Sequence, residues 1–129
     1  MTTPPTILVV DDEPAIRALV SDVLTSEGYR VRQAGDGEAA LRLIEQERPA
    51  AIVANVAMPR LDGVRLTAIL RERGLVIPTI LMSAAGEPPG HAAFLFVSKP
   101  FELDHLLAVV ERAIATPGAD QAARSAADD

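Results

Sequence analysis

Short apolar segments that alternate with amphipathic ones constrain the fold of this chain more than any other feature. The first, Thr6–Val10, reads TILVV and is rich in β-branched residues, as expected for a strand buried on both faces. Residues 11–28 follow with a proline in the first turn, apolar residues at helical spacing and a glycine at the end. This predicts a strand and then a helix, with Asp12 or Glu13 as the helix cap.

The same alternation continues along the chain. Further strands are predicted at 29–34, Ala51–Asn55, 78–83 and 94–98, and further helices at 38–47, through Leu66 and Leu70, and at 103–114. Alternation at this spacing indicates right-handed crossovers, and therefore an α/β fold with a doubly wound, five-stranded parallel sheet flanked by helices. Residues 84–91 interrupt it, because their two prolines and two glycines predict a loop and a fourth helix that is shortened or missing.

Composition limits both the domain organisation and the partners. The 129 residues, 49% of them hydrophobic, suffice for one domain at residues 1–116, and residues 117–129 lack large apolar side chains and are predicted to be a disordered tail. A net charge of −6 without clustered Lys and Arg argues against nucleic-acid binding. No apolar run approaches the roughly 18 residues of a membrane span, and no signal peptide is visible. We expect a cytoplasmic protein that binds neither nucleic acid nor membrane.

Polar residues stand where the predicted strands end. In such a sheet ligands bind beyond the carboxyl ends of the strands, so these residues are considered together. Two adjacent carboxylates repel each other and attract a cation, and Mg²⁺ is bound by oxygen ligands of this kind. A lysine and a hydroxyl group would suit a phosphoryl group beside the metal. The residues concerned are Asp11, Asp12, Asn55, Ser83 and Lys99.

Several motifs together resemble the receiver domain of two-component response regulators. They are ILVVDDEP, the segment from Gly28 to AGDGEAAL, MPRLDG, LMSA and KPF, in this order over residues 7–114. The resemblance implies a flavodoxin-like receiver fold for residues 1–116. It also assigns roles: metal ligands at Asp11, Asp12 and the Ala57 carbonyl, phosphoryl contacts at Ser83 and Lys99, an aromatic switch at Phe96, and the phosphoacceptor position at Asn55.

Asn55 departs from the family pattern, in which this position is an aspartate. An amide oxygen is uncharged and a far weaker nucleophile than a carboxylate, so we expect no aspartyl phosphorylation. The same change removes one of three negative charges at the metal site. Mg²⁺ binding at Asp11, Asp12, Asn55 and Ala57 is therefore predicted to be weakened but not abolished. Together with the shortened fourth helix, this predicts a pseudo-receiver without a catalytic residue.

The leading functional interpretation is a phosphorylation-independent signalling module that is not an enzyme and acts by protein–protein interaction. Its partner would be a histidine kinase, a phosphotransfer protein or an effector, and a homodimer is also open. A second interpretation is a conventional Mg²⁺-dependent phosphoacceptor that carries an engineered Asp-to-Asn substitution at position 55. A third is a small-ligand sensor that uses the loop at 87–91 and the acidic pocket.

Overall fold

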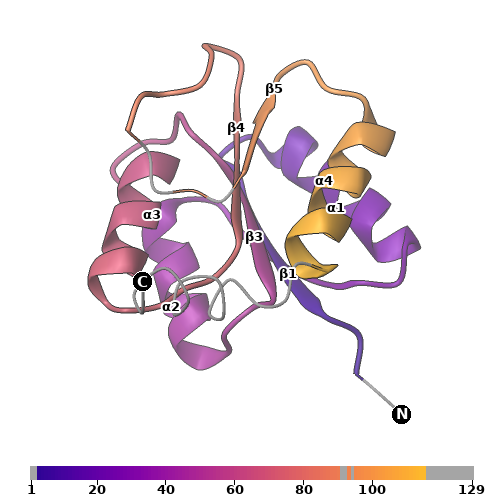
Figure 1. Cartoon of the computed structure of the whole chain (residues 1–129), viewed down its shortest axis with the longest axis horizontal. Coiled ribbons are helices and arrows are strands. Elements are labelled where there is room, and N and C mark those ends of the chain that lie inside the picture. Colours follow the sequence, from indigo (N-terminus) through magenta and orange to yellow (C-terminus); the bar gives the residue numbers. More distant parts are fainter. Residues whose placement is uncertain (1–2, 91–92, 94, 116–129) are drawn as a thin grey trace, which may run out of the picture.

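The computed structural model describes residues 3–90, 93 and 95–115 (Figure 1). They form a five-stranded parallel sheet with the order β2-β1-β3-β4-β5, which confirms the predicted fold class. Among the described residues, no helix is long and apolar enough to cross a membrane. In chain order the elements are β1 (Thr6–Val10), α1 (Pro14–Ser26), β2 (Arg30–Ala34), α2 (Gly37–Gln46), β3 (Ala51–Asn55), α3 (Gly63–Glu72), β4 (Thr79–Ser83), β5 (Leu95–Ser98) and α4 (Leu103–Ala115).

Helices cover both faces of the sheet, α1 and α4 on one side and α2 and α3 on the other (Figure 1). Alternate residues of each central strand enter the two cores: Ile7 and Val9 face α1 and α4, whereas Leu8 and Val10 face α2 and α3. Because both faces are covered, every residue of β1, β3 and β4 is buried. This double burial explains why these strands are continuous apolar runs in the sequence.

Two aspartates define where α2 and α3 begin. The Asp36 and Asp62 side chains accept hydrogen bonds from backbone N–H groups three residues later, at 2.8 Å in both cases. Each is followed by a glycine that forms the first residue of the helix, so the Asp-Gly pairs of the sequence mark helix starts. At Gly63 a Cβ atom would lie 2.5 Å from the Asn55 carbonyl oxygen, so α3 starts directly against the end of β3.

The start of α1 differs from the prediction of an Asp12 or Glu13 side-chain cap. Glu13 occupies the N-cap position, but its side chain makes no capping hydrogen bond, and Asp12 is exposed. Instead, the Glu13 backbone N–H donates to Asp11 Oδ1 at 2.9 Å. The first helical residue is Pro14, which has no N–H to satisfy. The prediction of Glu13 at the N-cap position is therefore confirmed, but the expected side-chain cap is replaced by a hydrogen bond to Asp11, which directly follows β1.

The segment after β4 contains no helix in its described residues, 84–90 and 93, which confirms the predicted loss of the fourth helix. Gly86 and Gly90 have φ angles of +95° and +67°, which a right-handed helix does not contain. Ser83 Oγ accepts a hydrogen bond from the Ala85 N–H at 3.0 Å and turns the chain away from β4. Predictions that fall on His91, on Phe94 as the first residue of the last strand, and on the tail at 117–129 lie outside the described residues.

One buried hydroxyl on α1 leads to a stability prediction. Ser21 is 3% exposed, and its Oγ has no hydrogen-bond partner among the described residues. We expect Ser21→Ala to raise the free energy of unfolding by about 1 kcal/mol, because it removes an unsatisfied polar atom and improves helix propensity. Urea unfolding followed by circular dichroism measures this. Ser26→Ala is the matched control on the same helix, since Ser26 Oγ is exposed and donates to the Val23 carbonyl at 2.7 Å. A Ser21→Ala protein no more stable than Ser26→Ala would contradict the prediction.

Candidate functional site

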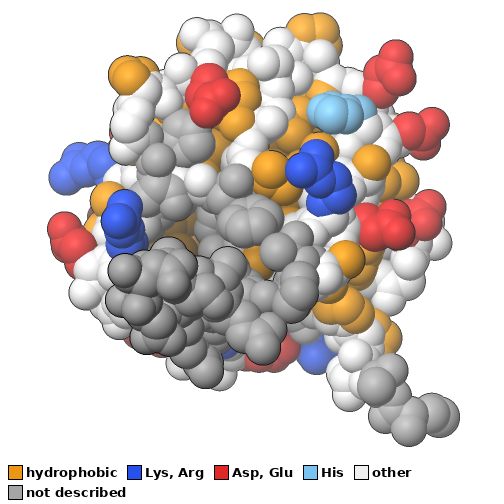
Figure 2. Space-filling model, viewed as in Figure 1, with side chains coloured by type: hydrophobic (Ala, Val, Ile, Leu, Met, Phe, Trp, Pro, Cys, Tyr) orange, Lys and Arg blue, Asp and Glu red, His pale blue; other side chains and the backbone are white. Residues whose placement is uncertain are grey.

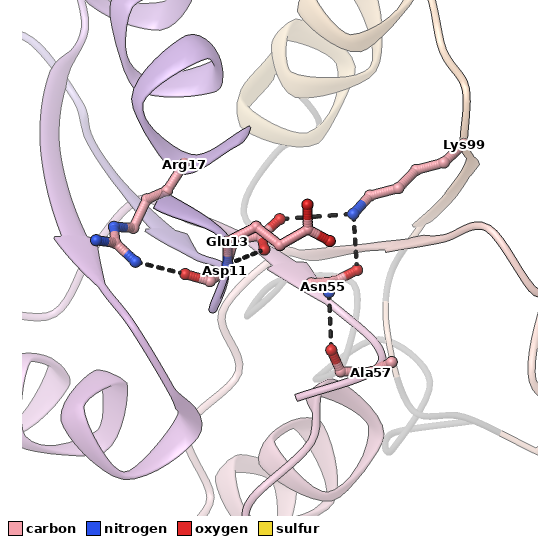
Figure 3. Close-up of polar contacts among 6 residues, drawn as sticks. All are labelled: Asp11, Glu13, Arg17, Asn55, Ala57 and Lys99. Carbon is pink, nitrogen blue, oxygen red and sulfur yellow. Dashed lines mark hydrogen bonds and ion pairs between the residues drawn. The ribbon is translucent and has the colours of Figure 1, made fainter. Parts of the chain in front are cut away.

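The ends of β1, β3, β4 and β5 meet at one edge of the sheet, as parallel pairing requires. Asp11 directly follows β1, Asn55 ends β3, and Lys99 directly follows β5. Figure 3 shows their side chains converging beside Ala57, the second residue after β3. The structure therefore brings together four of the residues that the sequence assigned to the site.

Asp11 is the buried acid of this cluster, with 0% exposure. Its Oδ1 accepts a hydrogen bond from the Glu13 backbone N–H, whereas Oδ2 has no hydrogen-bond partner among the described residues. Lys99 Nζ lies 3.6 Å from Oδ2 and forms an ion pair with it. Because a buried carboxylate is costly without a compensating charge, Lys99 is the group that makes this burial tolerable.

Asn55 is engaged at both ends of its amide. It is 6% exposed, Oδ1 accepts a hydrogen bond from Lys99 Nζ at 3.0 Å, and Nδ2 donates to the Ala57 carbonyl at 2.8 Å. An ammonium group can only donate and a backbone carbonyl can only accept, so these neighbours require this orientation of the amide. A carboxylate at this position could accept from Lys99 but could not donate to Ala57.

Of the three remaining predicted site residues, Ser83 ends β4 beside the cluster, where its backbone carbonyl accepts a hydrogen bond from the Lys99 N–H at 2.8 Å. Asp12 is exposed and makes no hydrogen bond or ion pair with other described residues. Ser83 is 5% exposed, and its hydroxyl accepts from the backbone of the following loop. Phe96 lies in the middle of β5, half-buried against the core beneath α2 and α3. Their predicted roles as metal ligand, phosphoryl contact and switch stay predictions.

The N-cap residue Glu13 and the α1 residue Arg17 were not identified as site residues from the sequence. Arg17 Nη1 donates to the Asp11 backbone carbonyl at 2.7 Å, and the Glu13 side chain points toward Lys99 and Asn55 (Figure 3). They are four residues apart at the start of a helix that begins beside Asp11, so they share one helix face. The four-residue spacing indicates in the sequence that the two side chains are on one side of the helix. It does not indicate that this side is the one facing the strand ends.

The cluster does not fit a tightly held Mg²⁺ ion. Mg²⁺ requires several oxygen ligands in a strict geometry. The Asp11 Oδ2 atom accepts no hydrogen bond from the described residues, but it forms an ion pair with the Lys99 ammonium group. The Ala57 carbonyl already accepts a hydrogen bond from Asn55 Nδ2. A divalent cation would have to displace one of these contacts and would face the charge of Lys99.

The comparisons with known proteins identify the family of the chain. The family model of the response regulator receiver domain matches residues 7–111. The chain is 36% identical over 127 residues to response regulator MprA of Mycobacterium leprae, covering 94% of this chain and 56% of that protein. It is also 36% identical over 118 residues to the nitrogen assimilation regulatory protein NtrX of Azorhizobium caulinodans, covering 85% of this chain and 26% of that protein.

Solved structures show the same fold at high coverage. The receiver domain of NtrX from Brucella abortus matches with a TM-score of 0.76 and 34% identity, and Vibrio cholerae chemotaxis protein CheY4 with a TM-score of 0.79 and 28% identity. In each case the match covers 85% of this chain and 98% of the other. The chain spans about half the length of the MprA relatives and less of NtrX. Sequence match, fold and strand-end cluster together show that the chain belongs to the response regulator receiver domain family of two-component signalling.

Proposed function

We propose that this receiver domain signals by binding a protein partner and does so without aspartyl phosphorylation. The observation that carries the proposal is the state of Asn55, the residue at the phosphoacceptor position. Both ends of its amide are engaged inside the protein, and an amide oxygen is a poor nucleophile toward phosphorus. Asp11 is buried and ion-paired with Lys99. The next residue in the sequence, Asp12, has an exposed carboxylate.

We further propose that the domain is not an enzyme and that it acts in the cytoplasm. It binds Mg²⁺ weakly, because the Ala57 carbonyl already accepts a hydrogen bond from Asn55 and Asp11 already forms an ion pair with Lys99. Its partner is a histidine kinase, a phosphotransfer protein or an effector, the classes with which response regulators work. Self-association would be a further form of the same protein–protein activity.

A groove between α1 and the start of α4 supports a protein partner. It has a volume of about 320 Å³ and is lined by Ile16, Leu19 and Val20 of α1 and by residues 99–101 and Leu103. Leu19 is 47% exposed, which is unusual among the large apolar residues that the structure describes. The exposed residues near the lining ones in the sequence include four acids, Asp12, Glu13, Glu102 and Asp104. Figure 2 shows acidic side chains around α1 and α4, together with a histidine and a basic side chain. A matching partner would insert an apolar side chain flanked by basic ones.

A second candidate is a conventional phosphoacceptor receiver in which Asn55 replaces the aspartate. Lys99 favours it, because its ammonium group lies 3.0 Å from Asn55 Oδ1, where it would contact a carboxylate equally well. In the first candidate the protein signals with Asn55, whereas in the second it signals with a phosphorylated aspartate at this position. Under both candidates the chain with Asn55 is not phosphorylated.

Intact-mass measurement after incubation with acetyl phosphate and Mg²⁺ tests the proposal. The unmodified chain should gain no phosphoryl group, whereas Asn55→Asp should gain one that hydroxylamine removes, as it removes acyl phosphates. Asp12→Asn in both backgrounds is the control for a neighbouring nucleophile. A stoichiometric adduct on the unmodified chain would contradict the proposal, and its loss in Asp12→Asn would show that Asp12 had become the acceptor.

A further inference from the structure

The Asn55 side chain links two segments that are not neighbours in the sheet. β4 lies between β3 and β5, so no strand pairing joins the ends of β3 and β5 directly. Lys99 Nζ crosses the end of β4 to reach Asn55 Oδ1, and Asn55 Nδ2 holds the Ala57 carbonyl in the loop before α3 (Figure 3). We call the chain of contacts Lys99–Asn55–Ala57 the amide clamp.

The clamp needs an amide because its two ends have opposite chemistry. The Lys99 end requires an acceptor, and the Ala57 end requires a donor. Aspartate would supply the first only and would place a carboxylate oxygen against the Ala57 carbonyl oxygen. Asn55 is therefore more than a lost nucleophile, because it makes a contact that a carboxylate cannot make without a cation between the two oxygens.

Lys99 provides the positive charge of the clamp. It is the only lysine of the chain, since the other residues among the 12 Lys and Arg are all arginine. Its side chain is 16% exposed, and its compact ammonium group contacts both Asn55 Oδ1 and Asp11 Oδ2. Arginine would present a planar fork instead of a point charge. A chain that otherwise uses arginine thus has its one lysine where a small cation fits between two acceptors.

We propose that Asn55 is a positioning residue that holds the loop at 56–62 against the end of β5 without a divalent cation. Lys99 takes the place of the metal charge, and the Asn55 donor takes the place of a metal contact to Ala57. The clamp thereby holds the loop and the end of β5 in one arrangement without Mg²⁺ or a phosphodonor. This inference deepens the proposed function and rests on it for its biological meaning, a partner surface that is always presented.

Amide hydrogen exchange in the whole chain tests the clamp. The reporters are the amide of Val56 in the loop, which donates to the Met82 carbonyl, and the amide of Gly63 at the start of α3, which donates to the Val56 carbonyl. A third is the Lys99 amide, which donates to the Ser83 carbonyl. In chelator, Asn55→Asp should speed exchange at Val56 and Gly63 about fivefold or more, the equivalent of one hydrogen bond, relative to the core amide of Val53. The exchange rate of the Lys99 amide should be unchanged, because the carboxylate of Asn55→Asp still accepts a hydrogen bond from the Lys99 side chain.

Adding millimolar Mg²⁺ separates the clamp from a general loss of stability. Mg²⁺ should restore slow exchange at Val56 and Gly63 in Asn55→Asp and should leave the unmodified chain unchanged. A variant that was merely less stable would show faster exchange at Val53 as well. Slower exchange at Val56 and Gly63 of the unmodified chain on Mg²⁺ addition would overturn the proposal, as would unchanged exchange in Asn55→Asp in chelator.

The single lysine gives an independent measurement of the other end of the clamp. An amine-reactive ester labels Lys99 and the N-terminal amine, and the N-terminus serves as the internal reference. Asn55→Leu removes the acceptor and should raise the relative labelling rate of Lys99 severalfold, whereas Asn55→Asp should not. Equal rates in all three proteins would overturn the Lys99 end of the proposal. Neither experiment contains a phosphodonor, so their failure is distinguishable from failure of the phosphorylation test.

Discussion

Lys99→Met should lower the free energy of unfolding by about 2–4 kcal/mol. The substitution leaves the fully buried Asp11 carboxylate without its ion-pair partner and Asn55 Oδ1 without its donor. Removing one member of a buried pair costs about 3–5 kcal/mol, and the 16% exposure of the Lys99 side chain lets water recover part of this cost. Urea unfolding at neutral pH measures the difference directly.

Two controls separate the buried charge from the loss of the lysine side chain. Asp11→Asn combined with Lys99→Met should recover most of the stability, because no unpaired charge remains in the interior. Arg73→Met breaks the ion pair between Arg73 and Glu45, whose side chains are 47% and 64% exposed, respectively. It should therefore lower the free energy of unfolding by less than about 1 kcal/mol. A Lys99→Met protein as stable as Arg73→Met would mean that Asp11 does not depend on Lys99.

Gly63→Ala should lower the free energy of unfolding by about 2–3 kcal/mol, although alanine is the better helix former. The new Cβ would lie 2.5 Å from the Asn55 carbonyl oxygen and 2.9 Å from Leu81 Cδ2. Relieving that overlap requires α3 to move away from β3, and overpacking of this kind costs about 1–3 kcal/mol or more, against less than 1 kcal/mol gained in helix propensity. Thermal and urea unfolding of the variant measure the net effect.

Gly35→Ala is the matched control for Gly63→Ala. Gly35 has an ordinary negative-φ backbone, and its Cβ would meet a single atom, Arg17 Nη1, at 3.4 Å. That atom is the end of a flexible side chain, so the cost should stay within about 0.5 kcal/mol. If Gly63→Ala proved equally mild, α3 would not be seated on the Asn55 carbonyl in the way the structure shows.

The amino-acid sequence by itself determined the architecture and the place of the site. Apolar β-branched runs alternating with helical periodicity are local patterns, and they led to the parallel sheet, the bounds of β1 and β3, and the missing helix after β4. Because parallel strands end at one edge, the sequence also predicted that Asp11, Asn55 and Lys99 would meet. The charge difference between asparagine and aspartate needs no structure at all.

Only the tertiary structure decided which polar atoms pair. Asp11 and Asp12 look equivalent in the sequence, but one is buried and the other exposed, because consecutive residues after a strand point to different sides. The contact between Lys99 and Asn55 spans 44 residues and depends on how far β5 and the β3–α3 loop extend beyond the sheet. Such contacts depend on the path of the chain in three dimensions, for which local periodicity contains no signal. The amide clamp and the ion pair between Lys99 and Asp11 Oδ2 therefore became visible only in the folded protein.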